Sequence, residues 1–146
     1  MKIYLAGPLF TQAERRWNRE LAAVLVKLKP NLHIILPQDM EIEFRGNEPD
    51  FTTIFRRNVE SIEISEAVVA ILDGSDSDSG TAWECGYAYA KGKPVIGVRT
   101  DFRISENGNL NAMLSQSAYV VFQESLNEDI VELGKKIIEK LEKLGL

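Results

Sequence analysis

AVVAILDG, residues 67–74, is a continuous apolar run that ends in an Asp-Gly pair. A strand with one face in water alternates apolar and polar residues, whereas a strand covered by helices on both faces is apolar throughout. The run therefore predicts a strand buried inside a parallel sheet. The acidic loop SDSDSG, residues 75–80, follows it and leads into a short apolar helix that contains Glu84.

Strand-like and helix-like segments alternate on both sides of this run. The other predicted strands are 2–7, 33–37, 94–98 and 118–122; the predicted helices are 11–29, 51–65, about 82–90, 110–116 and 126–144; residues 38–50 and 101–109 are predicted loops. This alternation predicts an α/β, flavodoxin-like three-layer sandwich with a five-stranded parallel sheet in the order 2-1-3-4-5. Because repeats and long linkers are absent, residues 1–146 are expected to form a single domain.

The composition excludes several classes of protein. The chain has 146 residues, a net charge of −5 and no large basic block, so nucleic acid is not an expected partner. A single cysteine, Cys85, excludes an internal disulfide, and a lone His33 leaves no imidazole cluster for a metal, so we expect neither a metal nor a cofactor. The sequence has no secretory signal and no apolar run of membrane-spanning length. We therefore expect a soluble, cytoplasmic protein that does not bind membranes.

The predicted strand order also predicts the position of a ligand site. In an open parallel sheet, ligands bind outside the carboxyl ends of the strands, where the strand order reverses. The loops that meet there are AGPLF, residues 6–10, and DGSDSDSG, residues 73–80. The second loop carries Asp78 and directly precedes the helix of Glu84.

Glu84 has two interpretations. Thr81 to Glu84 fits a capping box, in which the glutamate only closes the helix start. Alternatively, Glu84 lies in the first turn of a helix aimed at the crevice, whose positive end keeps the carboxylate ionised as a nucleophile requires. Asp78 would then carry a proton, and two such carboxylates are the groups needed to cleave a glycosidic bond. Gly80 and Gly86 indicate a close approach of backbone to packing partners or ligand.

Three segments of the chain resemble the nucleoside 2-deoxyribosyltransferase family. They are KIYLAGPLF at 2–10, AVVAILDG followed by DSGTAWECGYAYAKGKPVIG at 78–97, and NLNAM at 109–113. The resemblance covers almost the whole chain. It implies an enzyme of nucleotide salvage in which a glutamate attacks the anomeric carbon of a 2'-deoxynucleoside and expels the base. The covalent deoxyribosyl-enzyme then passes the sugar to another purine or pyrimidine base.

The resemblance also implies roles for individual residues. Glu84 matches the nucleophile, Asp78 matches the aspartate that handles the proton on the base, and Tyr4 matches a tyrosine that orients the glutamate. An Asn-x-Met pair that a neighbouring subunit inserts to bind the sugar is matched at 111–113, so the resemblance implies a homo-oligomer with shared sites. The expected substrate-binding residues are Gly7, Leu9, Phe10, Asn58, Asp73, Gly80, Asn111 and Met113.

Two features of the chain bear on the alternatives. Many relatives have an aspartate where this chain has Asn58, and there that residue helps to hold the base. A sister group hydrolyses deoxynucleoside 5'-monophosphates and has a serine at the position of Asp78, so Asp78 and Asn111 favour free nucleosides. Hydrolysis of monophosphates is the alternative function. A non-enzymatic nucleotide-binding module of the same fold is less favoured, because the chain has no glycine-rich phosphate loop.

Overall fold

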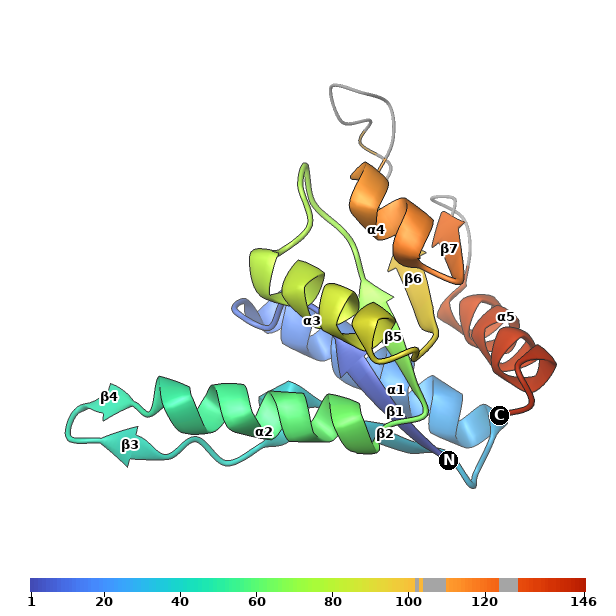
Figure 1. The fold of residues 1–146 in the computed structure, drawn as a ribbon. Helices are drawn as coiled ribbons and strands as arrows, with labels where there is room; N and C mark the ends of the chain where they lie inside the picture. Colours follow the sequence, from blue (N-terminus) through green and yellow to red (C-terminus); the bar gives the residue numbers. More distant parts are fainter. Residues whose placement is uncertain (102, 104–109, 124–128) are drawn as a thin grey trace.

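The computed structural model describes residues 1–101, 103, 110–123 and 129–146. Five parallel strands form its central sheet in the order β2-β1-β5-β6-β7 (Figure 1). Numbered among themselves, these strands have the order 2-1-3-4-5, which confirms the predicted flavodoxin-like topology. Their bounds are β1 Lys2–Ala6, β2 His33–Ile35, β5 Ala67–Ile71, β6 Val95–Arg99 and β7 Val120–Gln123.

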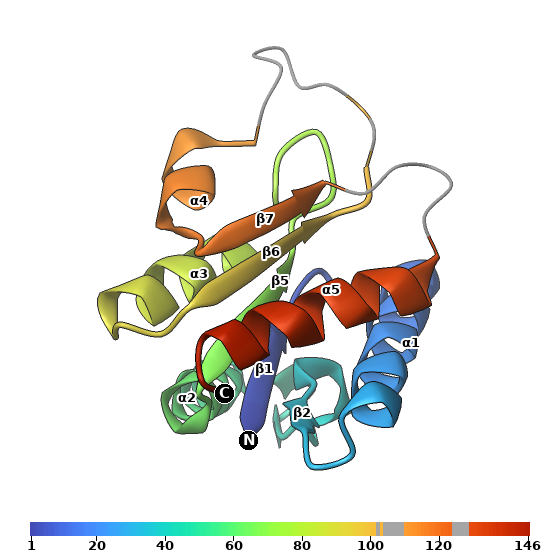
Figure 2. The same cartoon turned by 90° about the vertical axis from the view of Figure 1, so that its right-hand side faces the viewer.

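Helices cover both faces of the sheet, as the buried run at 67–74 predicts (Figures 1 and 2). The helices α1 and α5 pack on one face, and α2, α3 and α4 pack on the other. Their bounds are α1 Gln12–Leu28, α2 Phe51–Ile64, α3 Ser79–Ala90, α4 Ala112–Ser117 and α5 Ile130–Lys143. The start predicted for the last helix, and most of the predicted loop 101–109, lie outside the described residues.

Strand β1 shows how the two faces are built. Its side chains alternate between the two faces, because successive residues of a strand point in opposite directions. Ile3 and Leu5 belong to the core beneath α1 and α5, whereas Tyr4 and Ala6 belong to the core beneath α2, α3 and α4. All four side chains are at most 1% exposed.

The segment predicted as a loop at 38–50 is partly ordered. A short 3₁₀ helix, Pro37–Asp39, begins at the last residue of the strand predicted at 33–37 and runs into this segment, which also contains a small antiparallel hairpin of β3 Phe44–Arg45 and β4 Glu48–Pro49. The left-handed backbone of Gly46, with φ of 70°, makes the turn between them. Strands of two residues are too short to show an alternating pattern, so this hairpin could not be predicted from residue periodicity. Within the described residues, no helix has the length and apolar character needed to cross a bilayer.

Candidate active site

Helix α3 begins earlier than the capping-box interpretation requires. Asp78 is its N-cap: Oδ2 accepts hydrogen bonds from the Thr81 backbone N–H at 2.8 Å and from Thr81 Oγ1 at 3.0 Å. Glu84 therefore lies in the second turn and takes no part in the cap. Both the capping-box interpretation and the expected place of Glu84 in the first turn are wrong.

The Glu84 carboxylate instead joins three elements. Its Oε1 accepts a hydrogen bond from the hydroxyl of Tyr4 on β1 at 2.6 Å and a longer one from Nδ2 of Asn58 on α2 at 3.4 Å. A tyrosine that is buried needs a partner for its hydroxyl, and Glu84 supplies it. The structure thus brings Tyr4, Asn58 and Glu84 together at one point.

Burial controls the ionisation of Glu84. It raises the pKa of this carboxyl to about 7; the hydrogen bond from Tyr4 opposes the rise, and the negative charge of Asp78 adds to it. We expected the helix end to keep Glu84 firmly ionised, and this expectation is wrong because the carboxylate lies away from the helix end and is largely desolvated. At neutral pH the group exists in both forms. Burial, followed by the charge of Glu84, also raises the pKa of Tyr4.

The residue after Glu84 belongs to the core. Cys85 is 1% exposed and lies on the side of α3 that faces the core. Burial, followed by the charge of Glu84, raises the pKa of its thiol to about 12. The thiol therefore stays neutral beside the carboxylate.

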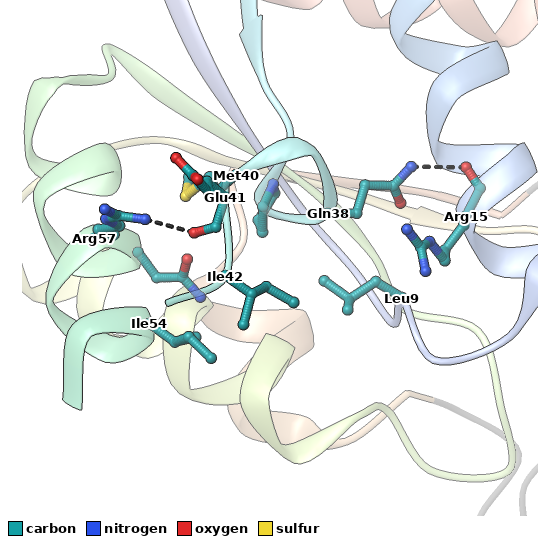
Figure 3. A pocket seen from close by; sticks show the side chains of 10 residues that line it. Leu9, Arg15, Gln38, Met40, Glu41, Ile42, Ile54 and Arg57 are labelled. Carbon is teal, nitrogen blue, oxygen red and sulfur yellow. Dashed lines mark hydrogen bonds between the residues drawn. The ribbon is translucent and has the colours of Figure 1, made fainter. Parts of the chain in front are cut away.

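A cavity of about 140 Å³ opens beside Asn58. Its lining side chains come from the loop after β1, helix α1, the segment after β2 and helix α2 (Figure 3). Because Asn58 lines the cavity and also contacts Glu84, the cavity is adjacent to the carboxylate. Its walls are apolar with a few polar groups, as in small-molecule sites. They consist of Leu9, Arg15, Pro37, Gln38, Met40, Glu41, Ile42, Ile54, Arg57 and Asn58.

Several cavity residues were missed by sequence analysis. Gln38, Met40 and Ile42 lie in the segment predicted as a loop, where no spacing indicates which side chains turn inward. The structure fixes the amide of Gln38 at both ends: Nε2 donates to the Arg15 carbonyl at 2.8 Å, and Oε1 accepts from Asn18 at 3.1 Å. The wall of the cavity is therefore held by polar contacts to α1.

Phe10 and the three glycines that the sequence pointed to lie in different surroundings. Phe10 is 76% exposed and does not line the cavity, although its neighbour Leu9 does. Gly7 packs closely against β5, since an added Cβ would lie 3.1 Å from the Ile71 side chain, and a Cβ at Gly80 would lie 3.1 Å from Asp78 Oδ2. A Cβ at Gly86 would meet nothing within 4 Å, so this chain does not require the close approach expected there.

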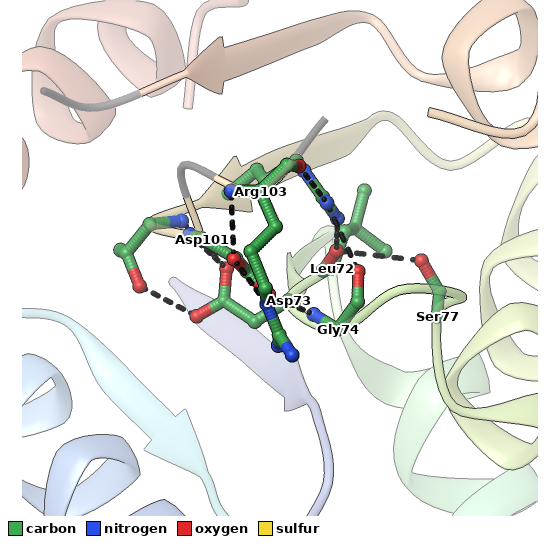
Figure 4. Close-up of polar contacts among 8 residues, drawn as sticks. Leu72, Asp73, Gly74, Ser77, Asp101 and Arg103 are labelled. Carbon is green, nitrogen blue, oxygen red and sulfur yellow. Dashed lines mark hydrogen bonds and ion pairs between the residues drawn. The ribbon is translucent and has the colours of Figure 1, made fainter. Parts of the chain in front are cut away.

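Asp73 ties together the ends of two strands (Figure 4). Its carboxylate accepts from the Thr100 backbone N–H at 2.6 Å, from Thr100 Oγ1 at 2.5 Å and from the Asp101 backbone N–H at 3.0 Å. Arg99, which is buried, donates to the carbonyls of Leu72 and Gly74. These bonds fix the start of the loop that leads to Asp78, so Asp73 acts on the shape of the crevice.

Asn111 and Met113 lie at the start of α4. Asn111 is its N-cap, with Oδ1 accepting from the Met113 backbone N–H at 2.9 Å, and both residues are exposed. No hydrogen bond among the described residues joins either of them to Glu84 in the same chain. Within that part of the chain there is also no group of three or more His, Cys, Asp or Glu side chains placed to hold a metal ion.

Comparison with known proteins identifies the family. The nucleoside 2-deoxyribosyltransferase family model matches residues 3–122. The chain belongs to this family. The 2-deoxyribosyltransferase from Bacillus psychrosaccharolyticus, whose structure is solved, is 28% identical to this chain, with a TM-score of 0.71 and coverage of 92% of this chain and 90% of that one. The family and this neighbour support an enzyme of deoxyribosyltransferase-like function.

Two further relatives of this transferase-family chain match over nearly their whole length. A conserved protein from Enterococcus faecalis has a crystal structure with a TM-score of 0.80 and 29% identity, covering 96% of this chain and 98% of that one. An uncharacterized protein of Ureaplasma parvum is 32% identical in an alignment that covers 92% of this chain and 98% of the relative.

Proposed function

We propose that this protein transfers the 2-deoxyribosyl group of a 2'-deoxynucleoside to an acceptor purine or pyrimidine base, through a covalent intermediate on Glu84. The observation that carries the proposal is the carboxylate held by Tyr4 and Asn58 beside the cavity. A fixed carboxylate next to a small, mostly apolar cavity matches the need for a nucleophile next to a flat base.

In the first half-reaction, a carboxylate oxygen of Glu84 forms a bond to C1' of the sugar while the bond from C1' to the base nitrogen breaks. The bonding electrons leave with the base, which accepts a proton. Asp78 is the proposed proton carrier. Both hydrogen bonds of its cap go to Oδ2, so Oδ1 is not used by the helix and can serve the base.

In the second half-reaction, a nitrogen of the acceptor base attacks C1' and Glu84 leaves as a carboxylate. The nitrogen loses its proton to the group that protonated the first base, so the enzyme returns to its starting state. Water could attack C1' in place of the base, and the product would then be free deoxyribose. The balance between these two acceptors separates a transferase from a hydrolase.

The active site is proposed to be shared in a homo-oligomer, with Asn111 and Met113 serving the neighbouring subunit. Their exposure supports this proposal, because Met113 is 78% exposed although it is apolar. The helices of the same sheet face also expose Phe51, Phe55 and Trp83, and an apolar patch of this kind is typical of an interface. Mixing inactive Glu84→Ala and Asn111→Ala chains should restore part of the activity, and a fully active monomer in light scattering contradicts the proposal.

One assay tests the function. The protein is incubated with deoxyinosine, with and without adenine, and the products are separated by chromatography. The expected result is deoxyadenosine and hypoxanthine when adenine is present, and little free deoxyribose. Glu84→Gln, which keeps the shape of the side chain, should lose several orders of magnitude of this activity.

The same assay distinguishes the alternative. If deoxyinosine monophosphate is preferred and free sugar phosphate is released even with excess adenine, the protein is a nucleotide hydrolase. The matched control for Glu84→Gln is Glu139→Gln, since Glu139 pairs with Lys143 on α5, on the opposite face of the sheet. This control should retain wild-type activity.

A further inference from the structure

Asn58 contacts both the nucleophile and the substrate cavity. It lies on α2, lines the cavity, and is half-buried. An asparagine side chain is neutral and can donate a hydrogen bond through Nδ2, whereas an ionised aspartate is charged and can only accept. The asparagine can therefore act on its neighbour Glu84 in a way that an aspartate at this position could not.

The contact with Glu84 fixes the orientation of the Asn58 amide. The side-chain atom near Glu84 Oε1, at 3.4 Å, is Nδ2. The reversed amide would place its oxygen against a carboxylate oxygen, and two acceptors repel each other. The hydrogen-bond network thus places the NH₂ group of Asn58 toward Glu84, and Oδ1 is the other end of the amide.

The two oxygens of Glu84 differ in their partners. Oε1 accepts from Tyr4 at 2.6 Å and from Asn58, whereas none of the described residues donates to Oε2. Glu84 is partly exposed. Among the described residues, the one fully buried side-chain polar atom without a partner is Nε1 of Trp17, so Oε2 is not a buried atom that lacks a partner. Among the described residues, Oε1 is therefore the oxygen that is held and Oε2 is the one without a donor.

We propose that Asn58 is a positioning residue for the nucleophile: its amide donates to Oε1 of Glu84 alongside the Tyr4 hydroxyl, which leaves Oε2 as the oxygen that attacks the sugar. This inference rests on the proposed function for the attack itself, but the contact on which it stands is present without substrate. It assigns to Asn58 a role toward Glu84 that is separate from any contact with the base.

The electrostatic surroundings of Glu84 make this donor important. Among the described residues, the groups that act on it are Tyr4 from β1, Asn58 from α2, and Asp78, the N-cap of α3. The Tyr4 hydrogen bond favours the ionised carboxylate, whereas burial and Asp78 oppose it. A second carboxylate at position 58 would face Oε1 with a like charge and would make ionisation of Glu84 harder still. A neutral donor there keeps the nucleophile available near neutral pH.

The test measures the ionisation of Glu84 directly. Protein labelled with ¹³C at the glutamate side-chain carboxyls is titrated by NMR without substrate, and the Glu84 signal is assigned by its loss in Glu84→Gln. In Asn58→Asp, the midpoint of this signal should rise by about one pH unit or more, because two neighbouring carboxylates resist double ionisation. In Asn58→Leu, which removes the donor without adding charge, it should rise by a smaller amount.

A matched control separates positioning from a change of cavity shape. Ile54→Val alters another α2 residue of the same cavity, and Ile54 makes no hydrogen bond to Glu84. It should leave the midpoint of Glu84 unchanged. If the midpoint does not move in Asn58→Asp and Asn58→Leu, the proposed role of Asn58 is wrong, whatever the enzyme's activity.

Kinetics then connect the contact to the reaction. The acid limb of the pH profile of kcat/KM should move upward with the NMR midpoint in Asn58→Asp, and kcat should recover at higher pH. A rise in KM with an unmoved acid limb would instead mean that Asn58 acts only on the base. Absence of any transfer or hydrolysis by the wild type would refute the proposed function, while the titration would still decide whether Asn58 acts on Glu84.

Discussion

The two faces of the central sheet differ in the side chains that they bury, and two neighbouring residues of β1 show the difference. Leu5 points to the face covered by α1 and α5, where the core is almost entirely aliphatic. Tyr4 points to the face covered by α2, α3 and α4, where its hydroxyl binds the carboxylate of Glu84. Both faces contribute stability through apolar burial, but the second also holds a costly, partly desolvated charge close to a cavity.

The largest stability effect is expected on the aliphatic face. Leu5→Ala should lower the free energy of unfolding by about 2–5 kcal/mol, because it removes a fully buried side chain and leaves a cavity. Urea unfolding measures this loss, and the activity per folded molecule should stay close to that of the wild type. A strong loss of activity in a folded Leu5→Ala protein would mean that the two faces are not independent.

The second effect concerns the charge on the other face. The pKa of Glu84 is about 7 in the folded protein and near 4.5 in an unperturbed chain, so the folded state holds its proton more tightly. Stability from this group is therefore present below about pH 4.5 and is lost as pH rises through 7. The full loss is roughly 3 kcal/mol.

This loss is isolated by comparison with Glu84→Gln. Unfolding free energies of both proteins are measured at about pH 5 and about pH 8, and the difference between the two proteins removes the contribution of other groups. The wild type should lose more stability than the variant over this range. Equal losses of unfolding free energy in the two proteins would show that Glu84 is not desolvated in the folded protein.

The smallest of the three effects should follow from Tyr4→Phe. A hydrogen bond to a charged group contributes about 1.5–3 kcal/mol, so kcat/KM near neutral pH should fall by about 10- to 150-fold. The acid limb of the pH profile should move upward, since the bond lowers the pKa of Glu84. Tyr89→Phe is the control: Tyr89 lies on α3 but is 62% exposed. An unchanged rate in Tyr4→Phe would remove Tyr4 from the mechanism.

The sequence was sufficient to predict the topology, because its evidence is repeated along the chain. The apolar run at 67–74 and the alternation around it require a parallel sheet covered on both faces. The same topology brings Tyr4 and Glu84 to one crevice although 80 residues separate them in sequence. These features depend on the burial of whole segments, which leaves a strong pattern.

The parts that sequence analysis missed depend on single hydrogen bonds. Whether α3 starts at Asp78 or at Thr81 decides the turn in which Glu84 lies, and both residues are good caps. The position of the helix start therefore decides whether the helix end or burial has the larger effect on the pKa of Glu84. The cavity wall around Gln38 was missed for a related reason, because its contacts to α1 join residues that no period relates.

Cys85 provides a reporter that needs no engineering. It is the single cysteine of the chain, and it is buried in the core next to Glu84. Because the pKa of its thiol is about 12, on the order of one thiol in 10⁵ is ionised at neutral pH. Alkylating reagents can therefore modify it only when the layer beneath α3 opens. The rate of alkylation therefore measures how often that layer opens. A ligand that binds only the closed protein would slow alkylation, and the slowing would increase with the ratio of its concentration to its Kd.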